Sequence, residues 1–296
     1  MSPTANITRR SAIAALVGSA GALLSDGRGA AAQTSSPSAL GGAELKGRLK
    51  QSVSRWCYPH FSLDDLCERA KAIGIRSVEL LGEHDWPTVK KHGLTCAMPN
   101  GPGGIADGWN RSENHDRLVR ESERLLPLIH AAGLPNMIIF SGNRRGLSDA
   151  EGLENCAKGI KRITKLAEDL GVTLCMELLN SKRDHKDYQC DHTAWGVELV
   201  KRVGSGRFKL LYDIYHMQIM EGDVVSTVQE NIAHLAHFHT GGIPGRHEID
   251  ETQELNYRRV AQAIAEAGFQ GFIAHEFVPV RDPMTSLQQA VRICDV

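Results

Sequence analysis

The sequence predicts a single α/β domain, a (β/α)8 TIM barrel preceded by an export signal and a short linker. Two observations predict the barrel. First, short apolar or β-branched runs alternate strictly with amphipathic helical stretches, which favours parallel strands joined by right-handed crossovers. Second, eight such pairs fit into roughly 245 residues, and a typical barrel has about 250. The alternative is an open doubly wound sheet, which most often carries a glycine-rich phosphate turn after its first strand; residues 58–61 (Tyr-Pro-His-Phe) are not such a turn.

The N-terminus has the features of a twin-arginine export signal. Arg9 and Arg10 precede a short, almost uncharged segment rich in Ala, Gly and Leu, and three successive alanines at 30–32 form a small-residue cleavage site. The apolar segment is short for the alternative, a membrane anchor. We therefore expect an exported, periplasmic protein divided into a signal peptide (1–32), a flexible linker (33–48) and the barrel (49–296).

Composition limits the class of protein. The 296 residues are 42% hydrophobic, which is enough for one large core, and the net charge of -1 argues against a nucleic-acid binder with a basic face. Beyond the N-terminal segment, no apolar run reaches the roughly 20 residues that span a membrane. The seven Cys lack Cys-x-x-Cys spacing, and most sit among apolar residues, where a thiol acts as a small hydrophobe. We expect a small-molecule partner, and the sequence leaves a homo-oligomer open.

Each strand and helix is placed by its own local signals. Strands are runs rich in β-branched and aromatic residues, and in chain order they cover residues 51–58, 77–81, 94–98, 136–140, 172–179, 208–215, 233–240 and 272–278. Helix termini follow from caps: Ser62 begins the first helix, Ser148 and Glu151 form a capping box, and Gly74 and Gly171 end helices. The helices cover residues 62–74, 86–92, 113–132, 148–170, 193–203, 223–231, 256–267 and 283–294.

The four C-terminal strands each carry one polar residue near their carboxyl end, where the active residues of a barrel lie. These residues are Glu177, Asp213, His239 and Glu276. Taken singly, each could be a structural ion-pair member or a core histidine. Three carboxylates in adjacent buried strands would repel each other strongly, and a divalent cation is the simple remedy. Three carboxylates and one imidazole suit one Mn2+, Mg2+ or Co2+ ion, with Zn2+ as an alternative.

Two further segments complete a family resemblance. Residues 210–223 (Leu-Leu-Tyr-Asp-Ile-Tyr-His-Met-Gln-Ile-Met-Glu-Gly-Asp) and 244–248 (Pro-Gly-Arg-His-Glu), together with Glu177 and Glu276 in their strands, resemble the hydroxypyruvate isomerase family. That family lies within the xylose-isomerase-like TIM barrels. The resemblance covers about residues 50–296, and the first of the two segments is highly specific.

The resemblance implies a role for each of these residues. A divalent metal would be held by Glu177, Asp213, His239 and Glu276, and substrate would be contacted by His216 and Arg246, with His247 assisting. The isomerases of this group often have Gln where this chain has His239, whereas the related ketose 3-epimerases have His there. The metal site survives either residue.

The expected reaction is a proton transfer on a small α-hydroxycarbonyl compound, in the first place hydroxypyruvate to tartronate semialdehyde. A metal that chelates the carbonyl and hydroxyl oxygens stabilises the enediolate. Glu177 and Glu276 are the expected base and acid. His216 is expected to polarise the carbonyl, and Arg246 to hold a carboxylate with two hydrogen bonds.

Three other functions compete with this one. A sugar 3-epimerase shares the metal site and the enediolate, and His239 favours it. A non-catalytic exported protein would keep the metal as a sugar clamp. A phosphodiesterase or abasic-site nuclease is disfavoured, because it needs several zinc ions and a basic groove.

Several other polar residues lie at strand ends or in the intervening loops. Glu79 ends the second strand, where it approaches the site or, as we favour, braces the barrel. Three residues in or near the loop after the third strand either shape the pocket or are solvated: Asn100, Trp109 and His115. His185 and His192 are expected to be loop residues.

Overall fold

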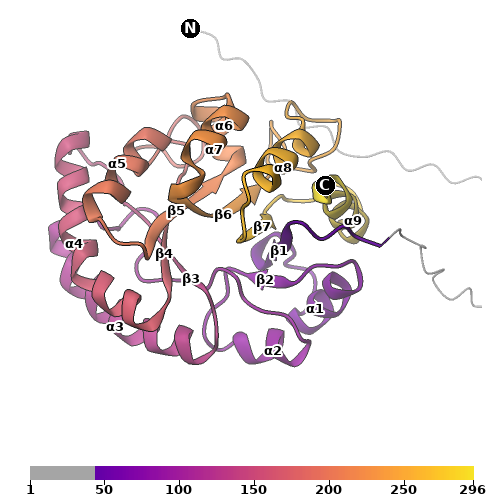
Figure 1. Ribbon diagram of the computed structural model, residues 1–296, viewed down its shortest axis with the longest axis horizontal. Coiled ribbons are helices and arrows are strands. Elements are labelled where there is room, and N and C mark those ends of the chain that lie inside the picture. The colour runs from indigo at the N-terminus through magenta and orange to yellow at the C-terminus, as the bar shows by residue number, and fades with distance from the viewer. Residues whose placement is uncertain (1–43) are drawn as a thin grey trace, which may run out of the picture. The chain divides into compact units, whose positions relative to one another are not determined.

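The structure is a computed structural model that describes residues 44–296. In this part of the chain one seven-stranded parallel sheet curls into a barrel, and helices surround it (Figure 1). Neighbouring strands follow the order β2-β1-β7-β6-β5-β4-β3. The strands are β1 (Lys50–Ser54), β2 (Ser77–Glu79), β3 (Asn136–Ile139), β4 (Thr173–Glu177), β5 (Phe208–Asp213), β6 (Leu235–Thr240) and β7 (Phe272–His275). The fold is of the TIM-barrel type, and the predicted signal peptide (1–32) lies outside the described residues.

The prediction of an eighth regular strand over residues 94–98 is wrong. A single bridge pairs this segment with β2, between Ser77 and Thr95. Side chains, and not the backbone of a neighbouring strand, bond both backbone groups of Ala97. The Ser77 hydroxyl accepts the Ala97 N–H at 2.8 Å, and the Asn136 amide donates to the Ala97 carbonyl at 2.8 Å. Further backbone bonds join the segment to β2 and the residue after it, and on the other side the carbonyl of Pro99 accepts the Ile138 N–H of β3. It therefore closes the barrel without the repeated ladder that defines a strand.

The helices follow the strands and confirm the predicted caps. The Ser62 side chain accepts the Asp65 N–H, and Ser148 and Glu151 form the capping box. The helices are α1 (Leu63–Ala72), α2 (Trp86–Lys91), α3 (His115–Ala131), α4 (Asp149–Leu170), α5 (Thr193–Val203), α6 (Ile214–Met220), α7 (Val224–Asn231), α8 (Tyr257–Glu266) and α9 (Pro283–Cys294). Short 3-10 turns cover Arg55–Cys57, Ser112–Asn114 and Ile232–His234.

Helix α6 is an element that the sequence analysis did not predict. Residues 208–215 were expected to be extended, but β5 ends at Asp213 and α6 begins at the next residue. The Asp213 Oδ1 accepts the backbone N–H of His216 at 3.0 Å and so caps the helix. The first strand is also shorter than predicted, because the Arg55 guanidinium holds a turn through the carbonyls of Tyr58 and Phe61.

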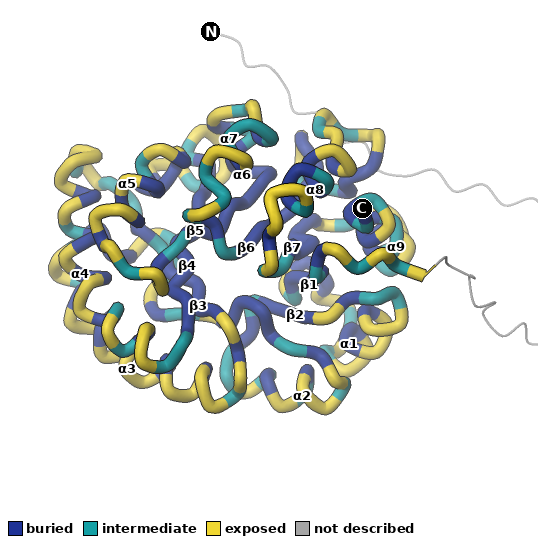
Figure 2. Tube along the Cα trace, viewed as in Figure 1, coloured by how far each residue is buried: buried dark blue, intermediate teal, exposed yellow. Residues whose placement is uncertain are grey.

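The interior of the barrel is buried, and the outer faces of the helices are exposed (Figure 2). The hydrophobic core joins the strands to the inner faces of the surrounding helices. All seven Cys are buried and free, as their apolar neighbours predicted. Among residues 44–296, no helix has the length and apolar character needed to cross a bilayer.

The last residues of the predicted linker are held against the end of the chain. The backbone N–H groups of Lys46 and Gly47 donate to the Asp295 carboxylate at 2.9 and 3.0 Å. Leu45 is packed against the core. Residues 44–48 therefore belong to the same compact unit as the barrel.

Candidate metal and active site

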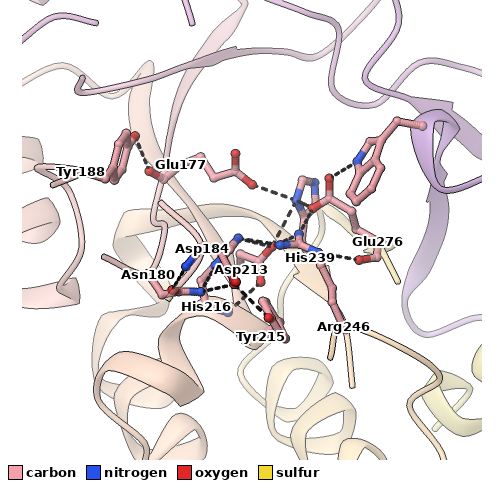
Figure 3. Close-up of polar contacts among 12 residues, drawn as sticks. Glu177, Asn180, Asp184, Tyr188, Asp213, Tyr215, His216, His239, Arg246 and Glu276 are labelled. Atoms are coloured by element: carbon pink, nitrogen blue, oxygen red, sulfur yellow. Dashed lines mark hydrogen bonds and ion pairs between the residues drawn. The ribbon is translucent and has the colours of Figure 1, made fainter. Parts of the chain in front are cut away.

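Four polar residues meet at the carboxyl ends of neighbouring strands (Figure 3). Glu177 ends β4, Asp213 ends β5, His239 lies near the end of β6, and Glu276 directly follows β7. Each is buried and offers one ligand atom, and these atoms all lie within 4.8 Å of one another. The structure therefore brings together the four residues that the sequence pattern singled out as metal ligands.

His239 stands at the centre of this cluster. Its Nδ1 lies 2.5 Å from Glu276 Oε2 and 3.1 Å from Glu177 Oε1. Its Nε2 points the opposite way, 2.9 Å from Oε1 of the fully buried Glu79. Burial alone would lower the pKa of His239, but the charge of Glu276 and the hydrogen bonds of Glu177, Glu276 and Glu79 raise it well above its usual range. The imidazole is thus placed between the cluster and Glu79.

Glu79 is outside the cavity and supports the cluster from the barrel interior. The same Oε1 that faces His239 also lies 2.9 Å from Nε2 of His237. Burial raises the pKa of Glu79, but the charge and hydrogen bonds of the two histidines outweigh it and bring the pKa to about 2. The contacts of Glu79 agree with a bracing role, which it exerts through a residue of the site.

The pKa values of the two glutamates in the cluster are shifted in opposite directions. Burial raises the pKa of Glu177 to about 7, although His239 opposes the shift. Burial acts on Glu276 too, but the positive charges of His239 and Arg246 hold the pKa of Glu276 well below its usual range. Two nearby carboxyl groups whose pKa values differ strongly are suited to act as the acid and the base of a proton transfer.

The donor set fits one divalent cation. It consists of three carboxylates and one imidazole nitrogen, which is a mostly hard set. The far nitrogen of His239 faces a carboxylate, the partner that orients a histidine ligand in many metal sites. Such a buried collection of carboxylates also needs positive charge close by.

Arg246 supplies part of that positive charge. Its Nη2 donates to Asp213 Oδ2 at 2.6 Å and to Glu276 Oε2 at 2.5 Å, and its Nε donates to the Glu276 carbonyl at 3.0 Å. The guanidinium also lies over the ring of Tyr215, 4.9 Å from its centroid. Arg246 therefore reaches into the cluster from the loop after β6 and is in contact with two candidate metal ligands.

His216 is placed beside this arginine by the first turn of α6. Its ring is fully buried, and its Nε2 lies 2.6 Å from Arg246 Nη1. Its Nδ1 lies 2.6 Å from the side-chain nitrogen of Asn180. Burial, with the charge of Arg246, keeps the pKa of His216 well below its usual range. The imidazole is therefore neutral in this environment.

Part of this site lines a cavity of about 570 Å3. One part of the lining is polar and contains Glu177, Glu276, His216, Arg246 and Asp184. The apolar part comes from β3 and from the segments that follow β2, β3 and β4. It contains Leu80, Ile105, Ile138, Phe140 and Leu179. A small polar molecule can therefore reach the cluster from a pocket that is partly apolar, as is usual for ligand sites.

His247 is the predicted substrate-binding residue that does not line the cavity. Its Nδ1 lies 2.9 Å from the carbonyl of Val278. The next residue, Glu248, is buried and accepts hydrogen bonds from the Ser286 hydroxyl and two backbone N–H groups. These contacts give residues 247 and 248 a structural role in the loop.

Trp56 is a site residue that the sequence analysis missed. Its indole N–H donates to Glu276 Oε1 at 2.6 Å, and its ring lines the cavity. The sequence feature that could have indicated Trp56 is its aromatic side chain near the end of the predicted first strand. Asn180, Asp184 and Tyr215 were also missed, although the Tyr215 hydroxyl and the Asn180 amide both donate to Asp184 Oδ2.

The remaining polar residues fall into two groups. Asn100 and His185 line the cavity. Trp109 and His115 are buried away from it, where His115 Nε2 lies 2.9 Å from the Trp109 carbonyl. His192 lies beside Asp191, half-exposed.

Comparison with known proteins places this chain in a family. A family model described as xylose isomerase-like TIM barrel matches residues 67–295. A 2-oxo-tetronate isomerase of Cupriavidus necator is 37% identical over 251 residues, which cover 78% of this chain and 93% of that protein. A human protein provisionally named a hydroxypyruvate isomerase is 25% identical over 258 residues, 78% of this chain and 90% of that protein.

A solved structure shows the same fold. The 3-keto-D-glucoside 4-epimerase of E. coli matches with a TM-score of 0.70 at 18% identity, over 83% of this chain and 100% of that one. At that identity the likeness concerns the fold alone. The family-model match and the 37% identical relative show the family of the chain as well as its fold. This chain belongs to the xylose isomerase-like TIM barrel family and is an enzyme of the isomerase or epimerase type.

Proposed function

We propose that the protein is a metal-dependent isomerase of short 2-oxo-3-hydroxy acids, a class that includes hydroxypyruvate and 2-oxo-tetronate. The observation that carries this proposal is the buried cluster of Glu177, Asp213, His239 and Glu276, two glutamates of which line the cavity, with Arg246 beside it. The names of the relatives support the substrate class. The reaction moves a proton from C3 to C2 and exchanges the positions of carbonyl and hydroxyl.

The metal would be held by the same four residues, with Mn2+, Mg2+ or Co2+ favoured by the predominance of oxygen donors. When bound, it supplies positive charge that stabilises the enediolate oxygens. Glu177 and Glu276 both reach the cavity and are the groups placed to take the C3 proton and return one to C2. Asp213 mainly anchors the metal, since its other oxygen caps α6.

Arg246 and His216 hold the substrate. Arg246 lines the cavity, and since its Nε and Nη2 hold Glu276 and Asp213, its Nη1 is the charged donor for a substrate group; a carboxylate matches that charge better than a neutral sugar hydroxyl does. His216, neutral and buried, is placed to polarise the substrate carbonyl by a hydrogen bond. A 2-oxo acid carries both groups on adjacent carbons, so that one molecule satisfies both residues.

Proton exchange in deuterated water is the direct test. The metal-loaded protein is incubated with hydroxypyruvate, 2-oxo-tetronate and four- to six-carbon ketoses, and the products and deuterium content are measured. We expect deuterium in the acids, loss of the reaction with chelator and recovery with Mn2+. A metal-loaded protein that exchanges no C–H proton of any of these compounds would instead be a non-catalytic binding protein.

A second candidate is a ketose 3-epimerase with the same metal site. The observation in its favour is His239, because His is the residue of the epimerases at that position, whereas isomerases often have Gln. An epimerase returns the proton to the opposite face of the same carbon. Ketohexose turnover that exceeds that of both acids would favour it.

We also propose that the protein works in the periplasm after export through the twin-arginine pathway. Arg9 and Arg10 before the apolar segment support this proposal. The protein should appear in the periplasmic fraction of a host with an intact pathway, shortened at its N-terminus. Replacement of both arginines by Lys should retain it in the cytoplasm at full length; unchanged export would contradict the proposal.

A further inference from the structure

The polarity of the cavity lining is divided along the strand order of the barrel. The candidate acid and base, the imidazole and the arginine lie on β4 to β7 or directly after them, and these strands are neighbours in the sheet (Figure 1). Apolar side chains from β3 and from the segments after β2, β3 and β4 form another part of the lining, which we call the apolar wall: Leu80, Ile105, Ile138, Phe140 and Leu179. The exposed amide of Asn100 lies beside them. The cavity therefore offers reactive groups in one part and an apolar surface in another.

The apolar wall is held by the interior of the barrel. Its member Ile138 belongs to a small buried cluster, and Leu80 and Phe140 pack against that cluster. The cluster consists of Met98, Ile138, Cys175 and Leu211. Three of the five wall residues are thus fixed by contacts with strands and with the segment that closes the barrel. They present a defined apolar surface to the molecule that fills the cavity.

Leu80 is held in a backbone conformation that its side chain disfavours. Its φ is +58°, in the left-handed region that Gly and Asn tolerate and that a Leu rarely adopts. The Leu80 N–H donates to the Met98 carbonyl at 2.8 Å, and the Asn100 N–H donates to the Leu81 carbonyl at 3.0 Å, which keeps this conformation in place. Backbone strain that persists at a cavity-lining residue points to a use for its side chain there.

The cavity is larger than a three-carbon acid requires. Its volume of about 570 Å3 lies within the range of roughly 300–1,000 Å3 that is usual for drug-sized ligands. In the proposed reaction the carboxylate, C2 and C3 of the substrate are occupied by Arg246 and the carboxylate cluster. The substituent on C3 takes no part in the proton transfer and is the group free to reach the apolar wall.

We infer that the substrate is a 2-oxo-3-hydroxy acid with an alkyl group on C3, and that the apolar wall binds this group, with Leu80 as a specificity-determining residue. The acid part of the substrate rests on the proposed function; the alkyl group rests on the wall and on the conformation of Leu80. An alkyl group on the wall removes apolar surface of both from water. A hydroxymethyl group would lose hydrogen bonds to water there without gaining a partner.

A matched pair of substrates tests the inference. The acid 2-oxo-3-hydroxypentanoate carries an ethyl group on C3, and 2-oxo-tetronate carries a hydroxymethyl group, so that the two differ by a methyl in place of a hydroxyl. With Mn2+-loaded protein we expect kcat/KM to be at least about tenfold higher for the ethyl compound. A wall that only keeps water from the reaction would not separate the two. Equal values, or a preference for 2-oxo-tetronate, overturn the inference.

Leu80→Asn is the matched variant, because Asn is similar in size, tolerates a positive φ and places an amide in the wall. We expect Tm to change little and the preference for the ethyl compound to fall about tenfold. Leu128→Asn, at a position on α3 that is 42% exposed, is the control and should keep the preference. Ile105→Asn makes the same test in a loop, should Leu80→Asn not fold. An unchanged preference in the folded wall variants overturns the role of the wall.

Binding of unreactive acids separates this inference from the proposed function. The acids 2-hydroxypentanoate and 2,4-dihydroxybutanoate lack the carbonyl, and they also differ by a methyl in place of a hydroxyl. By calorimetry on Mn2+-loaded protein we expect the first to bind at least about tenfold more tightly, with a more negative heat-capacity change. If this preference is found, and is lost in Leu80→Asn, while no acid is turned over, the proposed function fails and the apolar subsite stands.

The converse result is equally clear. Turnover of both 2-oxo acids without a preference, together with equal affinities for the unreactive pair or no binding of either, leaves the proposed function in place and overturns the alkyl-binding subsite.

Discussion

Glu79 Oε1 accepts a hydrogen bond from Nε2 of His239 at 2.9 Å, on the side of the imidazole opposite the carboxylate cluster. The proton on Nε2 leaves the Nδ1 lone pair free for a metal. His237 donates to the same oxygen and keeps the carboxylate in place. A buried glutamate outside the cavity thus determines which nitrogen of a candidate ligand points into it.

Glu79→Gln should therefore weaken metal binding. Loss of the charge behind a histidine ligand typically lowers metal affinity by about 10- to 100-fold. Isothermal titration with Mn2+ measures the effect, with the circular dichroism spectrum as a check on folding. An unchanged Kd in a folded variant would show that Glu79 braces the barrel without tuning the ligand.

Metal should stabilise the fold. A ligand present at 100 times its Kd adds about 2.7 kcal/mol to the free energy of unfolding. For a domain of this size that raises Tm by roughly 5–10 °C. Thermal melts of chelator-treated protein with and without added Mn2+ test this, and His239→Asn should lose most of the rise. An equal rise in that variant would place the metal elsewhere.

Glu177→Gln and Glu276→Gln should each lower kcat by at least about 10^2, the usual contribution of a general acid or base. The amide can still coordinate through oxygen, so metal stoichiometry and substrate binding should be retained. Rapid-quench kinetics and metal analysis measure the two properties separately. Near wild-type turnover in both variants would remove the acid–base assignment.

Trp56→Phe should slow turnover without unfolding the protein. The indole N–H bonds a charged carboxylate, and such bonds are worth about 1.5–3 kcal/mol, which corresponds to a roughly 10- to 100-fold lower kcat/KM. The side chain is 48% exposed, so Tm should change little. Trp195→Phe, which removes an indole N–H bonded to the Asp149 carbonyl on the surface, is the matched control. Equal losses in the two variants would deny Trp56 a specific role.

Arg246→Lys should discriminate between acid and sugar substrates. Lys keeps a positive charge beside Asp213 and Glu276 but lacks the separate N–H groups with which Arg holds these two carboxylates and still has Nη1 for a substrate carboxylate. We expect KM for hydroxypyruvate to rise at least about tenfold, with a smaller change for neutral ketoses. Steady-state kinetics on both classes decide the point; a larger loss with the ketoses would favour the epimerase.

The clustering of the four candidate ligands could be predicted from the sequence, because each is a polar residue inside an apolar run. Asp213 and His239 were predicted within two residues of the ends of the strands expected over 208–215 and 233–240, and the structure has β5 ending at Asp213 and β6 at Thr240. Helix α6 was missed because Ile214 and Tyr215 have the side chains of a strand, and the cap at Asp213 outweighs that preference.

Other parts of the site depend on contacts that no local pattern contains. Trp56 and Glu276 are 220 residues apart in the chain, and the pair meets only once the barrel is closed. Asn180 and His216 meet across two neighbouring strand ends. Residues 94–98 were read as a strand because their apolar character is that of a strand, whereas Ser77 and Asn136 replace its ladder bonds.

The helix cap at Asp213 has a consequence for how this site tolerates change. The spacing of three between Asp213 and His216 is the distance from a cap residue to the N–H it satisfies, so it is set by the first turn of a helix. One residue added or removed there would rotate the imidazole by about 100° around the axis of α6. An insertion or deletion in this turn would therefore move His216 out of its contacts with Asn180 and Arg246.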